Sequence, residues 1–309
     1  MGEDTFYYND FGTYLRGQLG CKVQKITIDA GFTCPNRDGT VGRGGCTYCN
    51  NQSFNPAYCH RHLSVKQQMT EGISFFARKY PEMKYLAYFQ AYTNTYASLD
   101  NLRRLYEEAL SVDGCVGIVI GTRPDCMPDE LLQYLSNLRR NTFVLVEYGI
   151  ESTDDATLLR INRGHNFACA AAAVQRTAQA DIPVGAHIIL GLPGEPRHTL
   201  ALQAQRLSSL PLTTLKLHQL QVVKGTRMAL EYMENPGEFH LFALNEYVDA
   251  VVDYVERLRP DIVLERFASQ SPNELLLAPD WGIKNHELVD KIKRRMRERN
   301  TCQGRLYEV

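Results

Sequence analysis

Residues 29–60 read DAGFTCPNRDGTVGRGGCTYCNNQSFNPAYCH. This stretch holds Cys34, Cys46 and Cys49 among Gly, Asn, Pro and Asp residues, a composition that neither a helix nor a strand favours. The residues just before it, 23–29 (VQKITID), alternate apolar and polar side chains as a strand does. The sequence therefore predicts an irregular loop at the C-terminal end of a strand, and this loop carries three thiols.

The three thiols are candidate metal ligands. Thiolates are soft ligands that suit zinc or an iron–sulfur cluster. A [4Fe–4S] cluster normally has four cysteine ligands, so a set of three leaves one iron with an open coordination position. Alternatively, Cys59 or His60 could complete a tetrahedral structural zinc site. The loop by itself leaves both alternatives open.

The composition is that of an ordinary globular protein. The 309 residues are 44% hydrophobic, which allows a large core in one barrel-sized domain or in a domain with an appendage. A formal net charge of -1 excludes a general basic field for nucleic acid. The N-terminus lacks a signal-peptide pattern, and no window approaches the roughly 18 apolar residues of a membrane span. We therefore expect a cytoplasmic protein without a membrane partner, in which cysteines stay reduced.

Strand and helix patterns alternate along most of the chain. Strands are expected at 23–29, 84–90, 116–121, 142–149, 183–190 and 213–220. Helices are expected at 64–80, with Ser64 as N-cap, and at 99–112, 128–139, 166–180, 196–208 and 240–258. Such alternation requires a parallel sheet whose crossovers cover its face. Six units before residue 225 predict an α/β fold, a partial TIM-like (β/α)6 barrel of parallel strands that is open on one side.

The regular alternation of strands and helices ends after residue 225. Pro236 and Gly237 mark residues 226–239 as a connection. One more strand is expected at 261–267, and a closing helix at 286–298. We therefore divide the chain into a barrel, 1–225, and a C-terminal extension, 226–309.

Polar residues follow the expected strands, where a barrel of this kind places its site. The second strand is followed by the turn 90–95, QAYTNT, and the third by Thr122 and Arg123. The fourth leads into Glu151 and then INRGH at 161–165, which contains Arg163. The fifth contains His187 and ends in GLPGE at 191–195.

Together these motifs resemble the radical S-adenosylmethionine (SAM) superfamily. Its cluster loop is usually Cys-x-x-x-Cys-x-x-Cys with an aromatic residue before the last thiol, here Tyr48, and this chain has a longer first gap. The segments LVEYGIES (145–152), INRGH and GLPGE are similar to motifs of the elongator catalytic subunit and of oxygen-independent coproporphyrinogen oxidase. With FQAYTNTY (89–96) and LKLHQLQVVKGT (215–226), the order of motifs along nearly the whole chain resembles the YhcC/YtqA-type branch.

The resemblance implies an enzyme with two cofactors. Cys34, Cys46 and Cys49 would hold a [4Fe–4S] cluster whose free iron binds SAM, and an electron from the cluster would cleave SAM to a 5′-deoxyadenosyl radical. It implies SAM contacts at Tyr48, Gln90, Thr93, Asn94, Thr122, Arg123, Glu151, Arg163 and His187. Glu151 would accept from the ribose and Arg163 would pair with the methionyl carboxylate, whereas His187 replaces an acidic residue of coproporphyrinogen oxidase. The division at residue 225 would then separate a radical SAM core from an elongator-like extension, and an electron donor such as a flavodoxin or ferredoxin would be a partner.

For the substrate, the resemblance implies a tRNA base, namely the side chain of a wobble uridine, with a small-molecule metabolite as the alternative. No residue is assigned a catalytic role. Candidate substrate contacts at and after the sixth strand are Lys216, His218, Gln219 and Lys224. The closing segment is basic and could attract a phosphate backbone through Lys284, Lys291, Lys293, Arg294, Arg295, Arg297 and Arg299. The ordinary alternative is a solvated amphipathic helix, because Leu288, Ile292 and Met296 form an apolar stripe.

Overall fold

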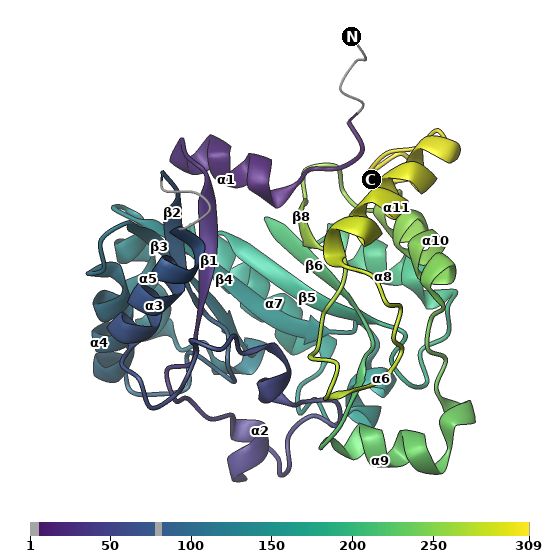
Figure 1. Ribbon diagram of the computed structural model, residues 1–309, viewed down its shortest axis with the longest axis horizontal. Coiled ribbons are helices and arrows are strands. Elements are labelled where there is room, and N and C mark those ends of the chain that lie inside the picture. The colour runs from purple at the N-terminus through teal and green to yellow at the C-terminus, as the bar shows by residue number, and fades with distance from the viewer. Residues whose placement is uncertain (1–5, 78–81, 309) are drawn as a thin grey trace.

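The computed structural model describes residues 6–77 and 82–308. Its main sheet has the strand order β1-β2-β3-β4-β5-β6-β8, and every neighbouring pair is parallel. The strands are β1 Val23–Ile28, β2 Lys84–Phe89, β3 Cys115–Thr122, β4 Phe143–Glu151, β5 Val184–Leu190, β6 Thr214–Gln219 and β8 Val263–Arg266. The sheet curls into a half-barrel (Figure 1). This confirms the predicted fold, with one strand more than the six units counted before residue 225 because the strand expected at 261–267 joins the same sheet.

Six helices of ten or more residues connect the strands and match the expected helices within a few residues at each end. They are α3 Val65–Ala77, α4 Leu99–Leu110, α5 Asp129–Arg139, α7 Phe167–Gln179, α8 Thr199–Ser208 and α10 Leu244–Val255. Ser64 caps α3 as predicted, because its hydroxyl accepts from the backbone N–H of Gln67 at 3.1 Å. Residues 78–80 of the helix expected at 64–80 lie outside the described residues.

Both faces of the sheet are buried, as the strand β2 shows. On one face, Tyr85, Ala87 and Phe89 pack into the large core between sheet and helices. On the other face, Leu86 and Tyr88 pack inside the half-barrel. Successive residues of a strand point to opposite faces, so a nearly continuous apolar run is what a doubly covered parallel strand requires.

An N-terminal helix that the sequence analysis did not anticipate, α1 Phe11–Leu19, covers the N-terminal end of the half-barrel. Its Leu15 packs against Leu86, Val119 and Leu145 on the concave face. Residues before α1 run beside β8, where the backbone N–H of Leu264 donates to the carbonyl of Asn9 at 2.8 Å. Residues of α1, among them Phe11 and Leu15, therefore form part of the wall of the interior at this end.

The segment 226–239, which was predicted to be a connection, is partly helical. It contains the helix α9 Arg227–Glu234 and the short 3-10 helix η3 Pro236–Glu238. Thr226 caps α9 through its hydroxyl, which accepts from the N–H of Ala229 at 3.0 Å. Pro236 and Gly237 therefore follow a helix end and do not exclude a helix before them.

The C-terminal residues pack onto the same core. The closing helix α11 Asn285–Glu298 buries Leu288, Ile292 and Met296 against the core that also contains α10, so the predicted apolar stripe is confirmed. A small antiparallel pair, β7 Val222–Val223 and β9 Leu276–Ala278, joins the end of the sixth unit to the loop after β8. The remaining short elements are α2 Pro35–Asp38, η1 Asn51–Phe54, η2 Pro124–Cys126 and α6 Asp155–Arg160. Among the described residues, no helix is long and apolar enough to cross a membrane.

Gly117 should be essential for packing β3 against β4. A Cβ at this position would lie 2.6 Å from Cβ of Phe143 and still closer to its backbone carbonyl oxygen. We expect Gly117→Ala to destabilise the fold by about 1–3 kcal/mol, the usual cost of overpacking. The matched control is Gly17→Ala, which meets no atom within 4 Å in α1 and should gain about 0.5–1 kcal/mol. Urea unfolding midpoints of the two variants test this, and equal midpoints would contradict it.

Candidate functional site

A cavity of about 700 Å³ lies on the concave side of the half-barrel. Predicted cysteine ligands, predicted SAM contacts and predicted substrate contacts all line it. The thiols of Cys34, Cys46 and Cys49 are on its wall. So are most of the predicted SAM and substrate contacts: Tyr48, Gln90, Thr93, Thr122, Arg123, Glu151, Arg163, His187, Lys216, His218 and Gln219. The structure thus brings together residues as far apart in the chain as Cys34 and Gln219, because parallel strands end at one edge.

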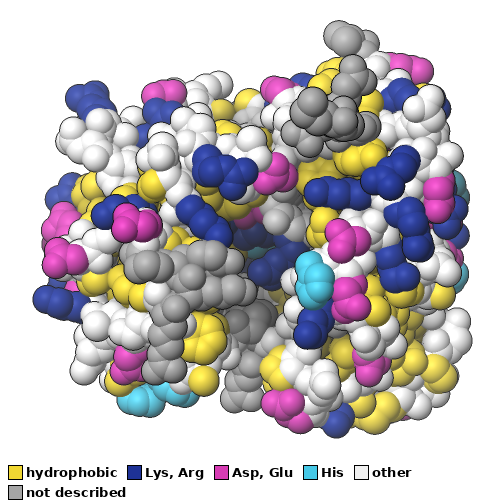
Figure 2. Space-filling model, turned by 45° about the horizontal axis from the view of Figure 1, so that its top comes forward, with side chains coloured by type: hydrophobic (Ala, Val, Ile, Leu, Met, Phe, Trp, Pro, Cys, Tyr) yellow, Lys and Arg dark blue, Asp and Glu magenta, His cyan; other side chains and the backbone are white. Residues whose placement is uncertain are grey.

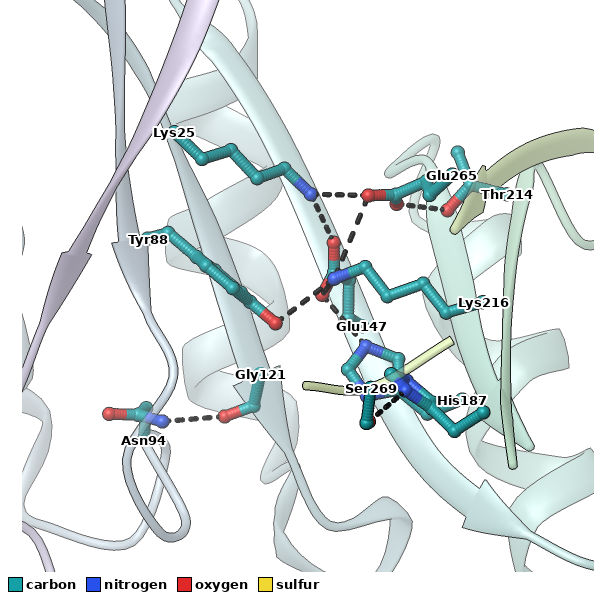
Figure 3. A network of polar contacts seen from close by, with 11 residues as sticks. Lys25, Tyr88, Asn94, Gly121, Glu147, His187, Thr214, Lys216, Glu265 and Ser269 are labelled. Atoms are coloured by element: carbon teal, nitrogen blue, oxygen red, sulfur yellow. Dashed lines mark hydrogen bonds and ion pairs between the residues drawn. The ribbon is translucent and has the colours of Figure 1, made fainter. Parts of the chain in front are cut away.

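Two predicted residues do not line this cavity. Asn94 is fully buried, and its amide donates to the carbonyl of Gly121 at 2.7 Å, which ties the turn after β2 to β3 (Figure 3). Lys224 is exposed, and its ammonium donates to the carbonyl of Glu274 at 2.9 Å. Both side chains thus bond to the backbone of neighbouring segments.

The cysteine loop is folded by close backbone contacts. Cys34 lies just before α2, and the N–H of Arg37 donates to its carbonyl at 2.8 Å. Asn36 then reaches across to the loop after α6, where its amide donates to the carbonyl of Asn162 at 2.6 Å. Gly42 leaves the space that the Asn36 amide occupies, since a Cβ there would overlap Oδ1 of Asn36. The loop is therefore fixed against the INRGH segment and is not free-standing.

Side-chain N–H groups point at two of the sulfurs. Cys46 Sγ accepts from Nδ2 of Asn36 at 3.6 Å and from Nη1 of Arg163 at 3.5 Å. Cys49 Sγ accepts from Nδ2 of Asn51 at 3.6 Å. Donors of this kind stabilise thiolates and tune the metal centre that thiolates hold. Burial, and then the neighbouring Cys46, raises the pKa of the Cys49 thiol to about 12, so a bound cation is needed to keep the Cys49 sulfur ionised.

This donor set fits an iron–sulfur cluster bound from one side. Among the described residues, no three His, Cys, Asp or Glu side chains are gathered closely enough to hold a single metal ion. The three thiols instead share one wall of the cavity. Cys59, the alternative fourth ligand, is buried away from that wall, and His60 is exposed.

Beside the cysteines lies a buried acid–base pair. Nη2 of Arg163 is 3.7 Å from Oε1 of Glu151, and the same guanidinium donates to the carbonyl of Gly149. Glu151 has φ 71, and the register of β4 against β5 shifts between Gly149 and Glu151, so a bulge turns this carboxylate toward Arg163. Gly149 leaves room for the pair, because a Cβ would lie 2.5 Å from Oε1 of Glu151 and 2.7 Å from Nη2 of Arg163 and would displace both side-chain ends.

The electrostatics around this pair favour a polar, charged ligand. Burial raises the pKa of Glu151, although Arg163 opposes that shift. Nε of Arg163 and Oγ1 of Thr93 are buried and have no hydrogen-bond partner within residues 6–77 and 82–308. Both residues line the cavity, so these two atoms are available to a ligand beside the cysteines.

Arg123 and Thr122 brace this region through partners that the sequence analysis missed. Arg123 donates to both carboxylate oxygens of Asp125, at 2.9 and 2.8 Å, and through Nη1 to the carbonyl of Arg163 at 2.9 Å. The hydroxyl of Thr122 is 2.6 Å from that of Thr95. Arg123 therefore fixes the backbone of the Arg163 segment. Asp125 follows Arg123 by two residues in the segment TRPD at 122–125, so the pairing could have been inferred from the sequence.

A second polar cluster lies between the strands of the half-barrel (Figure 3). Nζ of Lys25 is 2.6 Å from Glu147 and 2.5 Å from Glu265, and Lys216 also bonds to Glu147. Nε2 of His187 is 2.9 Å from Oε2 of Glu147, so His187 belongs to this cluster and not to the Glu151 pair. Although burial opposes its ionisation, Lys216 and Lys25 hold the pKa of Glu147 well below its usual range.

Lys25, Glu147 and Glu265 also line the cavity and were not predicted from the sequence. A signal for Glu147 was present, because a carboxylate in the middle of the apolar run FVLVEYG must find a buried partner. Its partners could not be found from the sequence, since Lys25 is 122 residues away.

The basic closing helix is partly neutralised by acidic neighbours. Arg299 is 2.6 Å from Asp249 and 2.5 Å from Asp253, and Arg295 is 3.4 Å from Asp249. Figure 2 shows Lys and Arg side chains mixed with Asp and Glu on this side of the molecule. Four basic residues of the predicted patch have no ion pair in the described part of the chain: Lys284, Lys291, Lys293 and Arg297.

Comparison with known proteins identifies the family. Residues 36–202 match the family described as Radical SAM superfamily, and residues 212–298 match the Radical_SAM C-terminal domain. The chain is 36% identical to YtqA of Bacillus subtilis over 301 residues, which is 97% of this chain and 93% of that protein. It is 26% identical, over 60% of its length and 39% of the other's, to a tRNA uridine(34) acetyltransferase of Dehalococcoides mccartyi.

The fold is likewise similar to a solved structure. The archaeal Methanocaldococcus infernus Elp3 with an N-terminal deletion superposes with a TM-score of 0.68 at 15% identity. The alignment covers 91% of this chain and 64% of that one. The resemblance drawn from the sequence motifs is thereby confirmed, while the division of this chain at residue 225 stays a prediction.

Loss of one cavity cysteine should empty the site. We expect Cys46→Ala and Cys49→Ala each to remove most of the iron bound after anaerobic reconstitution, because two thiolates cannot hold a cluster that normally has three or four protein ligands. Iron content and visible absorbance are the measurements. Cys59→Ala is the matched control and should keep the wild-type iron content. Loss of iron in that variant as well would show that the ligand set is not the three residues on the cavity wall.

Proposed function

This chain belongs to the radical SAM superfamily, and on that premise we propose that it cleaves SAM reductively in the cavity and uses the radical to modify a tRNA base, the side chain of a wobble uridine. The superfamily uses a [4Fe–4S] cluster and SAM. The observation that carries the proposal is the wall formed by Cys34, Cys46 and Cys49 beside the buried Glu151 and Arg163 pair. When bound, the cluster supplies the electron that breaks the sulfonium bond of SAM.

The residues of this chain would bind and orient SAM. Arg163 offers a buried guanidinium for the methionyl carboxylate, and a planar fork of N–H donors suits a carboxylate. Glu151 offers acceptors for the ribose hydroxyls. Thr93 adds a buried hydroxyl without a partner in the described residues. We keep Tyr48, Gln90, Thr122 and Arg123 as further SAM contacts or supports, because all four line the same cavity.

Two observations support tRNA as the substrate. The printed name of one distant relative describes an enzyme acting on uridine 34 of tRNA. In this chain Asn285, the first residue of α11, lines the cavity, so the basic residues of α11 extend from the rim of the site. Lys284, Lys293 and Arg297 are exposed and could contact phosphates while a base enters the cavity.

The proposal includes an electron donor such as a flavodoxin or ferredoxin, because reductive cleavage of SAM consumes an electron. We also propose that the protein works in a reducing compartment. Nine cysteines, including the three on the cavity wall, are free thiols in the structure. Thiols persist in the cytoplasm and not in oxidising compartments, so we place the enzyme there.

A two-part experiment tests the function. Anaerobically reconstituted protein, given dithionite and SAM, should release 5′-deoxyadenosine, and bound zinc without SAM cleavage would overturn the radical reaction. In the second part, modified nucleosides in tRNA from cells with and without the gene are compared by mass spectrometry. We expect one uridine derivative to change, and an unchanged profile would direct the search to a small-molecule substrate.

Arg163 should be needed for SAM more than for the cluster. We expect Arg163→Lys to weaken SAM binding at least tenfold, because lysine keeps the charge but loses the planar fork. The cluster absorbance should remain, since the three cysteines are intact. Equilibrium dialysis with labelled SAM under anaerobic conditions measures the effect, and Arg160→Lys on the surface of α6 is the control. Loss of cluster absorbance in Arg163→Lys would mean that Arg163 instead supports the cysteine loop.

A further inference from the structure

The polar cluster around Glu147 has no role in binding SAM as proposed above. It is built from the interior faces of five strands, through Lys25, Glu147, His187, Lys216 and Glu265 (Figure 3). All five residues line the cavity. A substrate that enters past the cysteines would therefore meet this layer.

The charges of the layer are satisfied internally. The two ammonium groups, of Lys25 and Lys216, face the two carboxylates of Glu147 and Glu265, so the formal charges cancel. Nζ of Lys216 also donates to the hydroxyl of Tyr88 at 3.0 Å. Burying such pairs is costly and seldom stabilises a fold by itself. The five residues themselves offer a ligand no unpaired charge, so an uncharged polar group can dock against them, while the guanidinium of Arg266 lies on the same cavity wall and acts on His218.

His187 presents a defined hydrogen-bond acceptor to the cavity. An ionised carboxylate can only accept, so Nε2 of His187 must carry the proton that it shares with Glu147 at 2.9 Å. Burial and the ammonium of Lys216 lower the pKa of His187 to about 4, which keeps the ring neutral. Nδ1 therefore holds a lone pair, because the hydrogen bond of this ring to the described residues is made by Nε2. The imidazole is 20% exposed on the cavity wall, so this lone pair is open to a ligand.

His218 lies next to His187, and one of its ring nitrogens already has a hydrogen-bond partner. Its Nδ1 is 2.5 Å from the hydroxyl of Ser269, and the two imidazole centroids are 5.5 Å apart. Ser269 is held in turn by Gln219, whose amide exchanges two hydrogen bonds of 2.9 Å with the backbone of Ser269. When the hydroxyl donates to Nδ1, Nε2 of His218 carries a proton, and Nε2 has no partner in the part of the chain that the structure describes.

We propose that His187 and His218 recognise the edge of a flat, uncharged lactam, an N–H group beside a C=O group, as a uracil ring presents it. Nδ1 of His187 accepts from the ring N–H, and Nε2 of His218 donates to the neighbouring carbonyl. Glu147 does not touch the substrate and is a positioning residue that fixes the His187 tautomer. This assignment rests on the proposed function, since it places the tRNA base in the cavity. His187 then belongs to the substrate side of the site and not to the SAM side.

The test separates substrate recognition from SAM cleavage. His187→Leu and His218→Leu remove the ring nitrogens at similar volume and leave Lys25, Lys216 and the carboxylates paired. His198→Leu, at an exposed position before α8, is the matched control. Release of 5′-deoxyadenosine with dithionite is measured with and without tRNA from cells lacking the gene. We expect release without tRNA to stay within twofold of wild type and the stimulation by tRNA to fall at least tenfold in both cavity variants.

A conservative variant guards against a merely structural effect. The amide of His187→Asn can place an acceptor near the position of Nδ1, so this variant should recover part of the stimulation that His187→Leu loses. Full stimulation in both leucine variants would overturn the inference. Loss of release without tRNA would also overturn it, since the histidines would then support the fold or the SAM site.

A binding measurement decides the inference even if tRNA proves not to be the substrate. Uridine is titrated into the reconstituted enzyme with SAM and 15N-labelled histidine, and the leucine variants assign the two ring signals. We expect saturable shifts of the His187 and His218 signals with uridine and much weaker shifts with 3-methyluridine, which lacks the ring N–H. Unshifted signals would overturn the lactam site. Absence of tRNA stimulation in the wild type with shifted signals would overturn the tRNA substrate alone.

Discussion

The parallel alignment of seven strands is the constraint on which the rest of the structure depends. In such a sheet every strand delivers its C-terminal end to the same edge, so the loops that follow β1, β3 and β4 meet there. The backbone N–H of Thr47 in the cysteine loop donates to the carbonyl of Ile161 at 3.0 Å. The amide of Asn36 reaches Asn162 in the same way. These contacts hold the cysteines against Arg163, so sheet and site form one unit.

The interior of the half-barrel changes character along its length. At the end covered by α1, Leu86, Val119 and Leu145 pack under this helix. The next layer is the charged cluster around Glu147, for which Gly185 leaves room, since a Cβ there would lie 3.1 Å from Cγ of Glu147. The cysteines and the Glu151 pair follow at the other end. A buried carboxylate is tolerable only because two ammonium groups and an imidazole surround it, and this requirement fixes the positions of side chains from several strands.

The residues after 225 add a strand to the main sheet. β8 pairs with β6, and the Lys25 to Glu265 ion pair links β8 to β1 across the open side of the half-barrel. Gln303 near the C-terminus donates to the carbonyl of Ile262 at 2.7 Å and accepts from the N–H of Asn9 at 3.0 Å. The family match at residues 212–298 and the sheet thus share β6 and β8. As a consequence, Arg266 and Asn285 form part of the cavity wall.

The sequence by itself determined the class of fold, the three thiols and the family, because these depend on local patterns. Alternating apolar runs specify parallel strands and helices, and the spacing of Cys34, Cys46 and Cys49 lies within one loop. Only the tertiary structure decided which polar side chains meet. It shows that His187, expected as a SAM contact, bonds to Glu147, and that Arg295 and Arg299 pair with acidic residues of α10. The physical reason is that an ion pair or hydrogen bond depends on distance in space, and partners such as Lys25 and Glu265, 240 residues apart, share no local pattern.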